Sequence, residues 1–364
     1  MKAGIVGLPN VGKSTLFNCL SNAKAQSANF PFCTIEPNIG VVNVPDPRLQ
    51  KLEELVQPER VLPATVEIVD IAGLVKGASK GEGLGNQFLG NIRECNAILH
   101  VLRCFDNDNI VHVDGNVNPI RDKETIDIEL QLKDLDTVEK RLEKSKKGAR
   151  TGNKEAILET ALLEKIRVEL LAGHSARVVK AANEEEQALL DSFQLITTKP
   201  VMYVCNVDEA SAVSGNHYVE QIRELVKDED AEVIFLAVGT EADITELESF
   251  EERQMFLEDL GLAEAGVSVL IRGAYKLLNL QTYFTAGVKE VRAWTIKVGD
   301  TAPKAAGVIH SDFEKGFIRA EVIAYDDYVQ FGSEAKVKEA GKLRVEGKEY
   351  IVKDGDVMHF RFNV

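Results

Sequence analysis

The sequence has few of the features that mark secreted, zinc-binding or nucleic-acid-coating proteins. Its five cysteines are scattered without a C-x-x-C pair, which excludes a zinc site on paired cysteines and favours reduced thiols in a reducing compartment. Lysine and arginine number 43 against 58 aspartates and glutamates, and the net charge of -15 disfavours indiscriminate binding to nucleic acid. The cysteines are Cys19, Cys33, Cys95, Cys104 and Cys205.

Long apolar runs are also missing. The opening residues lack the apolar block of a signal peptide, and no long uncharged span follows. We therefore expect a cytoplasmic protein without a membrane partner. A length of 364 residues is enough for two or three domains.

The sequence does contain a series of short apolar runs separated by helical or loop segments. This alternation predicts an α/β fold with a mostly parallel sheet covered on both faces. The predicted strands lie at 3–6, 66–70, 97–102, 201–205 and 233–236.

The chain between the third and fourth strands is too long for a simple crossover. Residues 125–147 and 154–171 repeat apolar side chains with a helical period, and the basic, glycine-containing stretch 144–154 between them predicts a turn. We expect an antiparallel helical hairpin inserted into the α/β domain. Ordinary surface helices of a larger α/β domain are the alternative.

After a predicted helix at 267–278, the tail of the chain changes character. It holds alternating or β-rich runs divided by glycine and aspartate, which predict a small mixed β domain. These runs lie at 291–296, 317–322 and 350–352.

One motif identifies a phosphate-binding loop. Gly7-Leu8-Pro9-Asn10-Val11-Gly12-Lys13-Ser14-Thr15 matches G-x-x-x-x-G-K-[ST] between a predicted strand and a predicted helix. Gly7 and Gly12 allow backbone N–H groups to wrap a phosphate chain. Lys13 can reach the β- and γ-phosphates as a catalytic residue, and the Ser14 hydroxyl can ligate Mg²⁺. The residues predicted to bind the nucleotide here are Asn10, Val11, Gly12, Lys13, Ser14 and Thr15.

Two further elements extend the magnesium and phosphate site. Asp70-Ile71-Ala72-Gly73 matches D-x-x-G after a strand, so the Asp70 carboxylate can hold the magnesium shell and the Gly73 N–H can sense the γ-phosphate. The glycine-rich residues that follow are expected to act as a switch. Thr34 is the candidate first-switch threonine that ligates Mg²⁺ when triphosphate is bound, the alternative being an ordinary loop threonine.

The glutamine that often follows D-x-x-G is absent. Leu74 stands there, and it cannot orient the attacking water, so hydrolysis is slow unless another group acts. His112, in the loop 105–113, is one candidate catalytic residue, with a solvated loop histidine as the alternative. Asn10 offers a second route, because it can help to ligate a monovalent cation beside the phosphates.

The guanine-reading sequence Asn-Lys-x-Asp is also missing, since Asn206-Val207-Asp208-Glu209 stands in its place. Val207 replaces the lysine, and Glu209 is one methylene too long for the bidentate position of the aspartate. The Asn206 side chain and the backbone near Val207 could serve adenine. A site without its hydrogen-bonding group loses discrimination, so adenine should be accepted at least as well as guanine. A degenerate GTPase that still prefers GTP is the alternative.

Together these motifs resemble the YchF subfamily of Obg-related P-loop proteins, the Obg-like ATPases. The resemblance rests on 7–15, 29–36, 70–91 and 206–209, and on the C-terminal runs 280–285, 293–295 and 305–313. It covers essentially the whole chain. One departure is Leu236-Ala237-Val238, where the family usually has Ser-Ala-Lys, which leaves Ala237 as the only match there.

The resemblance implies an architecture and an activity. It implies a P-loop G domain at 1–122 and 198–280, an inserted coiled-coil hairpin at 123–197, and a C-terminal TGS domain, a ubiquitin-like β-grasp module, at 281–364. It implies ATP hydrolysis in preference to GTP, with Mg²⁺ at Ser14 and Thr34, ATP contacts near Val207, and association with ribosomes (70S) and their large subunit (50S). K⁺ is the expected second cofactor. We expect a monomer, with a transient dimer possible.

The basic side chains near the predicted hairpin tip suit contact with rRNA, the alternatives being a ribosomal protein or a solvated helix face. They are Lys140, Arg141, Lys144, Lys146, Lys147, Arg150 and Lys154. Two functions from different classes remain open besides a conventional GTPase. One is an ATP-hydrolysing switch on ribosomes, and the other is a nucleotide-gated binding protein whose hydrolysis is incidental.

Overall fold

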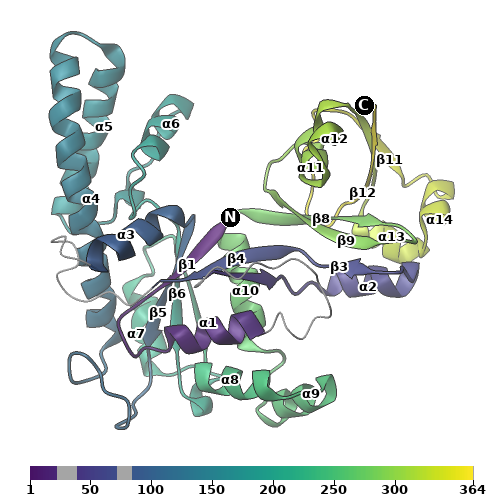
Figure 1. The fold of residues 1–364 in the computed structure, drawn as a ribbon, viewed down its shortest axis with the longest axis horizontal. Helices are drawn as coiled ribbons and strands as arrows, with labels where there is room; N and C mark the ends of the chain where they lie inside the picture. Colours follow the sequence, from purple (N-terminus) through teal and green to yellow (C-terminus); the bar gives the residue numbers. More distant parts are fainter. Residues whose placement is uncertain (23–38, 72–83, 364) are drawn as a thin grey trace. The chain divides into compact units, whose positions relative to one another are not determined.

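The computed structural model describes residues 1–22, 39–71 and 84–363, which form two compact units. The first holds 1–40 and 67–270, and the second holds 41–66 and 271–364. The first unit contains both the predicted nucleotide domain and the predicted hairpin (Figure 1). Residues 41–66 fall in the second unit, whereas the sequence analysis places them in the nucleotide domain.

A six-stranded sheet has the order β2-β4-β1-β5-β6-β7, and the pairs from β4 to β7 are parallel. All of its strands except β2 lie wholly or mostly in the first unit. This confirms the predicted α/β fold. Strand β2 was not predicted, because its five residues are short and include a glycine. The strands are β1 (Lys2–Val6), β2 (Ile39–Asn43), β4 (Thr65–Asp70), β5 (Ala97–Arg103), β6 (Val201–Asn206) and β7 (Glu232–Leu236).

Helices cover this sheet, with α1 against β1 and α8, and α4 against β5 and α7. Strands β5 and β6 are buried at every residue, which explains why their apolar runs are unbroken. The helices are α1 (Lys13–Asn22), α3 (Leu84–Glu94), α4 (Pro119–Arg150), α5 (Lys154–Leu171), α6 (Glu184–Ser192), α7 (His217–Leu225), α8 (Val238–Glu246), α9 (Phe250–Asp259) and α10 (Gly266–Leu277). Short 3₁₀ helices lie at Ala176–Val178 and Glu209–Ser211.

Helices α4 and α5 form the predicted antiparallel hairpin (Figure 1). The predicted turn at 144–154 is too long, because α4 continues to Arg150 and α5 begins at Lys154. Gly148 lies within the helix, where an added Cβ would be 3.0 Å from the Cβ of Ala156. This glycine therefore permits close packing of the two helices instead of ending the first one.

The base of the hairpin is fixed by Asp134, which is fully buried. Its carboxylate accepts hydrogen bonds from the backbone of Ile196 (2.9 Å) and Thr197 (2.7 Å) and from the Thr197 hydroxyl (2.7 Å). Ile128, Leu132 and Ile157, which belong to the predicted apolar period, are about half exposed. Other members of the same predicted period do form the hairpin core, namely Val138, Leu142, Leu162, Leu163, Ile166 and Leu170.

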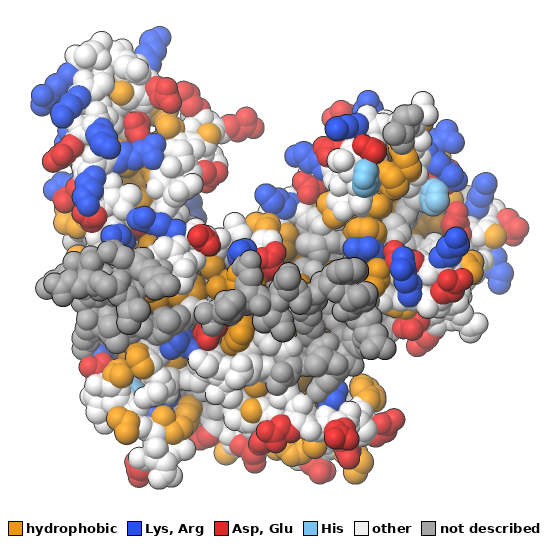
Figure 2. All heavy atoms as spheres, viewed as in Figure 1, with side chains coloured by type: hydrophobic (Ala, Val, Ile, Leu, Met, Phe, Trp, Pro, Cys, Tyr) orange, Lys and Arg blue, Asp and Glu red, His pale blue; other side chains and the backbone are white. Residues whose placement is uncertain are grey.

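Several basic side chains of the hairpin have acidic partners. Lys140 pairs with Asp136 at 2.8 Å, and Arg141 pairs with Glu159 at 2.5 Å. Lys146 pairs with Glu164 at 2.6 Å. Figure 2 shows both blue and red side chains on the surface of the hairpin. The positive surface predicted for the tip is therefore partly neutralised.

The second unit is the small β domain that the sequence predicts. Its sheet has the order β11-β10-β12-β8-β9-β3, and its core is built on Tyr283, Trp294, Phe317 and Phe360. The predicted run at 350–352 is not a strand, because Ile351 forms a single bridge with Thr301. The strands are β3 (Val61–Leu62), β8 (Leu280–Ala286), β9 (Val291–Lys297), β10 (Phe317–Ile323), β11 (Arg344–Glu346) and β12 (Val357–Phe362). The helices are α2 (Pro47–Val56), α11 (Ala302–Ile309), α12 (Ser311–Lys315), α13 (Tyr325–Phe331) and α14 (Glu334–Glu339).

Among the helices that the structure describes, none combines the length and the apolar character needed to cross a membrane.

Candidate nucleotide-binding site

The phosphate loop joins β1 to α1, as the motif predicts. Its glycines are required by close approaches. An added Cβ on Gly7 would lie 2.5 Å from the carbonyl oxygen of Val101, and one on Gly12, where φ is +98°, would lie 2.5 Å from Nδ2 of Asn206. Asn10 also has a positive φ of 64°, and its Nδ2 donates to the carbonyl of Val111 at 3.1 Å.

Lys13 is 7% exposed, and its Nζ donates to the Leu8 carbonyl at 2.6 Å, on the same loop. Burial lowers the pKa of this ammonium to about 8, and the Asp70 carboxylate opposes that shift. The side chain is thus held within the loop that would surround the phosphates. Since Lys13 forms no ion pair with a carboxylate of the described residues, this buried cation is suited to an anionic ligand.

The end of β4 places Asp70 beside the loop. The Ser14 hydroxyl lies 3.4 Å from Asp70 Oδ2, while the buried Oδ1 has no hydrogen-bond partner among the described residues. Burial raises the pKa of Asp70, and Lys13 and Ser14 oppose this shift. A carboxylate oxygen and a hydroxyl at this edge are the hard oxygen donors that Mg²⁺ prefers, so these residues fit the predicted metal.

The nucleotide pocket continues from the phosphate loop into a hollow of about 540 Å³. Asn206 holds its two walls together, since Nδ2 donates to the Val11 carbonyl (3.0 Å) and Oδ1 accepts from the Val238 N–H (3.1 Å). Both ends of this buried amide therefore already have backbone partners. Its predicted contact with the base stays a prediction, and its observed role is to tie the phosphate loop to the start of α8.

The other residues of the altered base motif are arranged differently from a guanine-reading set. Val207 is 3% exposed and its N–H donates to the Leu236 carbonyl at 3.1 Å. The Asp208 carboxylate accepts from the Ser211 N–H at 3.0 Å, capping the 3₁₀ helix in which Glu209 is exposed. All three line the pocket.

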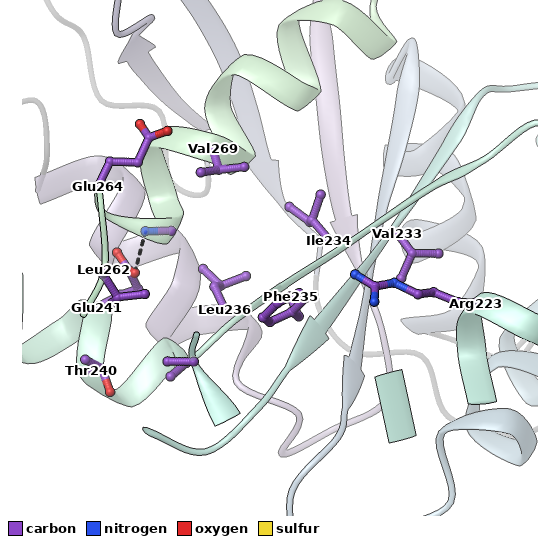
Figure 3. Close-up of a pocket in the computed structure, with 13 residues that line it drawn as sticks. Arg223, Val233, Ile234, Phe235, Leu236, Thr240, Glu241, Leu262, Glu264 and Val269 are labelled. Carbon is purple, nitrogen blue, oxygen red and sulfur yellow. Dashed lines mark hydrogen bonds between the residues drawn. The ribbon is translucent and has the colours of Figure 1, made fainter. Parts of the chain in front are cut away.

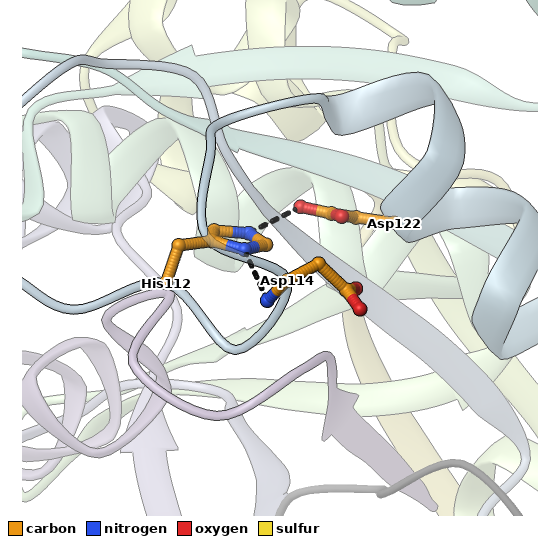
Figure 4. A group of neighbouring side chains, drawn as sticks. All are labelled: His112, Asp114 and Asp122. Carbon is orange, nitrogen blue, oxygen red and sulfur yellow. Dashed lines mark hydrogen bonds and ion pairs between the residues drawn. The ribbon is translucent and has the colours of Figure 1, made fainter.

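His112 is not the solvated loop residue that its sequence context allows, because it is 7% exposed. Figure 4 shows its ring between two aspartates: Nε2 lies 2.8 Å from Asp122 Oδ2, and Nδ1 accepts from the Asp114 N–H at 3.1 Å. Because Val111 accepts from Asn10, this polar cluster lies next to the phosphate loop. His112 does not line the hollow in the part of the chain that is described, and its catalytic role stays a prediction.

The loop that carries His112 is itself held by a buried arginine that sequence reasoning missed. Arg103, 2% exposed, donates to the carbonyls of Phe105 (3.2 Å), Asn107 (3.0 Å) and Ile110 (2.9 Å). These three residues also line the hollow. An arginine at the end of an otherwise apolar strand run was the available signal.

Three predicted residues lie outside the described residues. They are Thr34, Gly73 and Leu74.

A second hollow, of about 270 Å³, lies along β7 (Figure 3). Its buried polar group, Glu241, is already used, since its carboxylate accepts from the N–H groups of Gly266 (2.6 Å) and Val267 (3.2 Å). The remaining wall is formed mostly by apolar side chains of β7 with Leu262 and Val269. Arg223 also lines this hollow, but its guanidinium pairs with Glu220 at 2.6 Å.

The first strand of a parallel sheet leads through a glycine-dependent loop into a helix, and Lys13, Ser14 and Asp70 lie together at that loop. This arrangement defines a P-loop nucleoside triphosphate-binding protein of the GTPase fold. Two family models agree with the two units. One, described as a 50S ribosome-binding GTPase, matches residues 2–147, and YchF-GTPase_C, described as a protein of unknown function, matches 280–363.

Full-length relatives give the family. The chain is 60% identical to the "Ribosome-binding ATPase YchF" of Haemophilus ducreyi over 363 residues, covering 100% of this chain and 99% of that protein. It is 57% identical to the protein of the same name in Bacillus subtilis, with 100% of both chains covered. The solved YchF GTPase of Schizosaccharomyces pombe is 39% identical, with a TM-score of 0.89 over 99% of this chain and 97% of that one. The chain belongs to the YchF family.

Proposed function

We propose that this chain is a cytoplasmic ATPase of the P-loop class that associates with the ribosome and its large subunit. The observation that carries the proposal is a phosphate loop, with Lys13, Ser14 and Asp70 beside it, joined to a base pocket without the guanine-reading aspartate. In its place Glu209 is exposed on a 3₁₀ helix. Relatives over the full length carry the name "Ribosome-binding ATPase YchF", which supports the same activity and partner.

Different residues would contact different parts of the nucleotide and its metal ion. Lys13 would contact the β- and γ-phosphates, and Ser14, Asp70 and Thr34 would hold Mg²⁺, which neutralises phosphate charge when bound. The loop from Asn10 to Thr15 would supply N–H donors. Gly73 would contact the γ-phosphate through its N–H.

The adenine end relies on backbone acceptors. Adenine presents an amino donor where guanine presents a carbonyl, so it needs acceptors. The Val207 N–H is already bound to the Leu236 carbonyl. Backbone carbonyl oxygens of residues that line the hollow would therefore accept from the adenine amino group. Asn10 is the candidate ligand of K⁺, because its Nδ2 is bound to Val111 and its oxygen has no partner recorded among the described residues.

The decisive experiment is competition of ATP against GTP for one purified site, followed by phosphate release with and without ribosomes. We expect tighter ATP binding and hydrolysis that increases with ribosomes and in K⁺ relative to Na⁺. A clear preference for GTP would contradict the proposal. A preference for GTP has its own support, because the S. pombe structure and both family models carry the name GTPase.

A nucleotide-gated binding protein is the second candidate function. It is favoured by Leu74, which cannot orient water where many relatives of the fold use glutamine. On that reading, ribosomes and K⁺ leave the hydrolysis rate unchanged while ribosome binding still depends on the nucleotide. The same two measurements therefore separate the candidates. We expect a monomer in both cases, with dimerisation confined to turnover.

A further inference from the structure

The negative charge of the chain is concentrated in one short segment of the first unit. Residues 241–264 contain nine acidic residues and one basic residue, a net charge of -8 within a chain whose net charge is -15. The segment runs from α8 through α9 to the start of α10. Figure 2 shows acidic side chains with apolar ones between them over α8 and α9, at the lower edge.

The single basic residue does not neutralise this surface. Arg253 donates to the backbone carbonyls of Leu247 (2.7 Å) and Glu248 (3.2 Å), so it closes the connection between α8 and α9. Within the part of the chain that is described, no ion pair involves Glu251, Glu258 or Asp259. No described cation therefore balances these three charges, although Glu258 accepts a hydrogen bond from Nε2 of Gln254 at 3.1 Å.

An exposed apolar side chain lies at the centre of these charges. Met255 is 66% exposed, and its helical neighbours at i±3 and i±4 are Glu251, Glu252, Glu258 and Asp259. Residues at those spacings share one face of a helix. The Glu252 carboxylate is used in the capping box, where it accepts from the Ser249 N–H at 3.1 Å, so Glu251, Glu258 and Asp259 are the acidic neighbours of Met255 that remain for a partner. Phe250, at the start of the same helix, is 73% exposed.

Helix α9 thus exposes two large apolar side chains, Phe250 and Met255, among its carboxylates, and methionine adapts readily to irregular partners. The complementary ligand is an apolar side chain flanked by cations. Nucleic acid is disfavoured here, because its phosphates would face uncompensated carboxylates.

We infer that the outward face of α9, formed by Glu251, Met255, Glu258 and Asp259, docks a lysine- and arginine-rich protein segment of the ribosome. The inference rests on the proposed ribosome association and assigns this face to protein and not to rRNA. The first residues of α8 line the nucleotide pocket, and three residues separate the end of α8 from the start of α9. The proposed docking face is therefore close in sequence to the nucleotide pocket.

The test uses the full chain in ribosome co-sedimentation. The variant Glu251→Gln/Glu258→Gln/Asp259→Asn removes three charges from the face. The control Glu185→Gln/Glu220→Gln/Glu224→Gln removes three charges from exposed positions on α6 and α7. We expect the first to weaken ribosome binding about tenfold at about 50 mM salt, with the difference shrinking at about 300 mM, and the control to bind like wild type. Met255→Gln, which changes no charge, should weaken binding about threefold.

A second arm separates this inference from the proposed function. Binding of a labelled peptide with one leucine flanked by lysines is measured for the same variants. If wild type does not sediment with ribosomes, the proposed association fails, while loss of peptide binding in the α9 variant alone still supports the basic-segment site. Equal ribosome and peptide binding by the α9 and control variants overturns the inference. So does wild-type binding to protein-free rRNA that matches whole subunits, or a change of oligomeric state as the sole effect of the α9 variant.

Discussion

Gly12 and Asn206 meet at a distance that leaves no room for a side chain, since a Cβ on Gly12 would lie 2.5 Å from Nδ2 of Asn206. Asn206 in turn bonds the backbones of Val11 and Val238. The phosphate loop and the base-side loop are thereby held as one rigid surface. This accounts for an asparagine at the start of a base motif whose other positions no longer suit guanine.

Gly12→Ala should therefore disrupt the nucleotide site without unfolding the chain. It combines the clash with Asn206 and a φ of +98°, so we expect ATP affinity to fall about 100-fold, from a strain of about 1–3 kcal/mol. Titration with a fluorescent ATP analogue measures this. Gly90→Ala is the matched control, because nothing lies within 4 Å of its added Cβ, and it should bind ATP like wild type. Equal affinities for the two variants would contradict the proposed linkage.

The buried ammonium of Lys13 makes ATP binding depend on pH. Its pKa is lowered to about 8 by burial, from 10.5 in the unfolded chain, so the folded nucleotide-free chain binds fewer protons between these values and its free energy of unfolding rises with pH there. Bound phosphates favour the charged form. We expect proton uptake on binding and an ATP affinity that falls as pH rises through about 8, measured by calorimetry in buffers of different ionisation enthalpy.

Lys13→Met tests the same cause from the other side. Without a charge to bury, the nucleotide-free variant should unfold with a free energy about 1–2 kcal/mol higher at pH 7, while losing ATP hydrolysis. Chemical denaturation of both proteins at pH 7 and pH 10 gives the difference. A larger gain at pH 10 than at pH 7 would show that burial of the ammonium is not the cause.

Asp70 should determine the response to magnesium. Asp70→Asn removes the negative charge and replaces one carboxylate oxygen with an amide nitrogen, so ATP affinity should no longer improve when Mg²⁺ replaces a chelator, and hydrolysis should fall about 100-fold. Stability should change by less than about 1 kcal/mol, because burial of the carboxylate and its attraction to Lys13 oppose one another. Asp208→Asn alters a pocket carboxylate that caps a 3₁₀ helix and should keep the magnesium response.

The comparison of sequence with structure shows which features local pattern can predict. The five parallel strands were predicted because buried strands have continuous apolar runs, and the phosphate loop because its function fixes both residue types and spacing. The hairpin was predicted from its period, yet Ile128 and Leu132 proved half exposed. A period identifies a helix but does not say how much of its apolar stripe another element covers.

Long-range contacts account for what could not be predicted. Asn206 donates a hydrogen bond to a residue 195 positions away. Arg103 donates hydrogen bonds to carbonyls whose direction depends on the loop backbone. Gly148 suggested a turn, because glycine is common where a helix ends. Glycine is also favoured where two helices pack closely, and that is its role here. In each case the three-dimensional partner, absent from the local sequence, decides the role.

His112 provides the last prediction, because its buried ring lies beside the phosphate loop without lining the hollow. If His112 places the attacking water, His112→Ala should lower kcat about 100-fold and leave ATP affinity within about threefold of wild type. It should also lower the free energy of unfolding by about 1–3 kcal/mol, because the carboxylate of Asp122, 1% exposed, loses a partner. Single-turnover hydrolysis at a temperature where both proteins are folded separates the two effects.

The exposed His174, which pairs with Glu169 at the end of the hairpin, gives the matched control. His174→Ala should change neither kcat nor ATP affinity. Asp122→Asn distinguishes positioning from direct participation, since it keeps the imidazole and removes the charge beside it. An unchanged kcat in His112→Ala would leave His112 with a structural role alone and would require another group, such as a cation bound by Asn10, to act in the reaction.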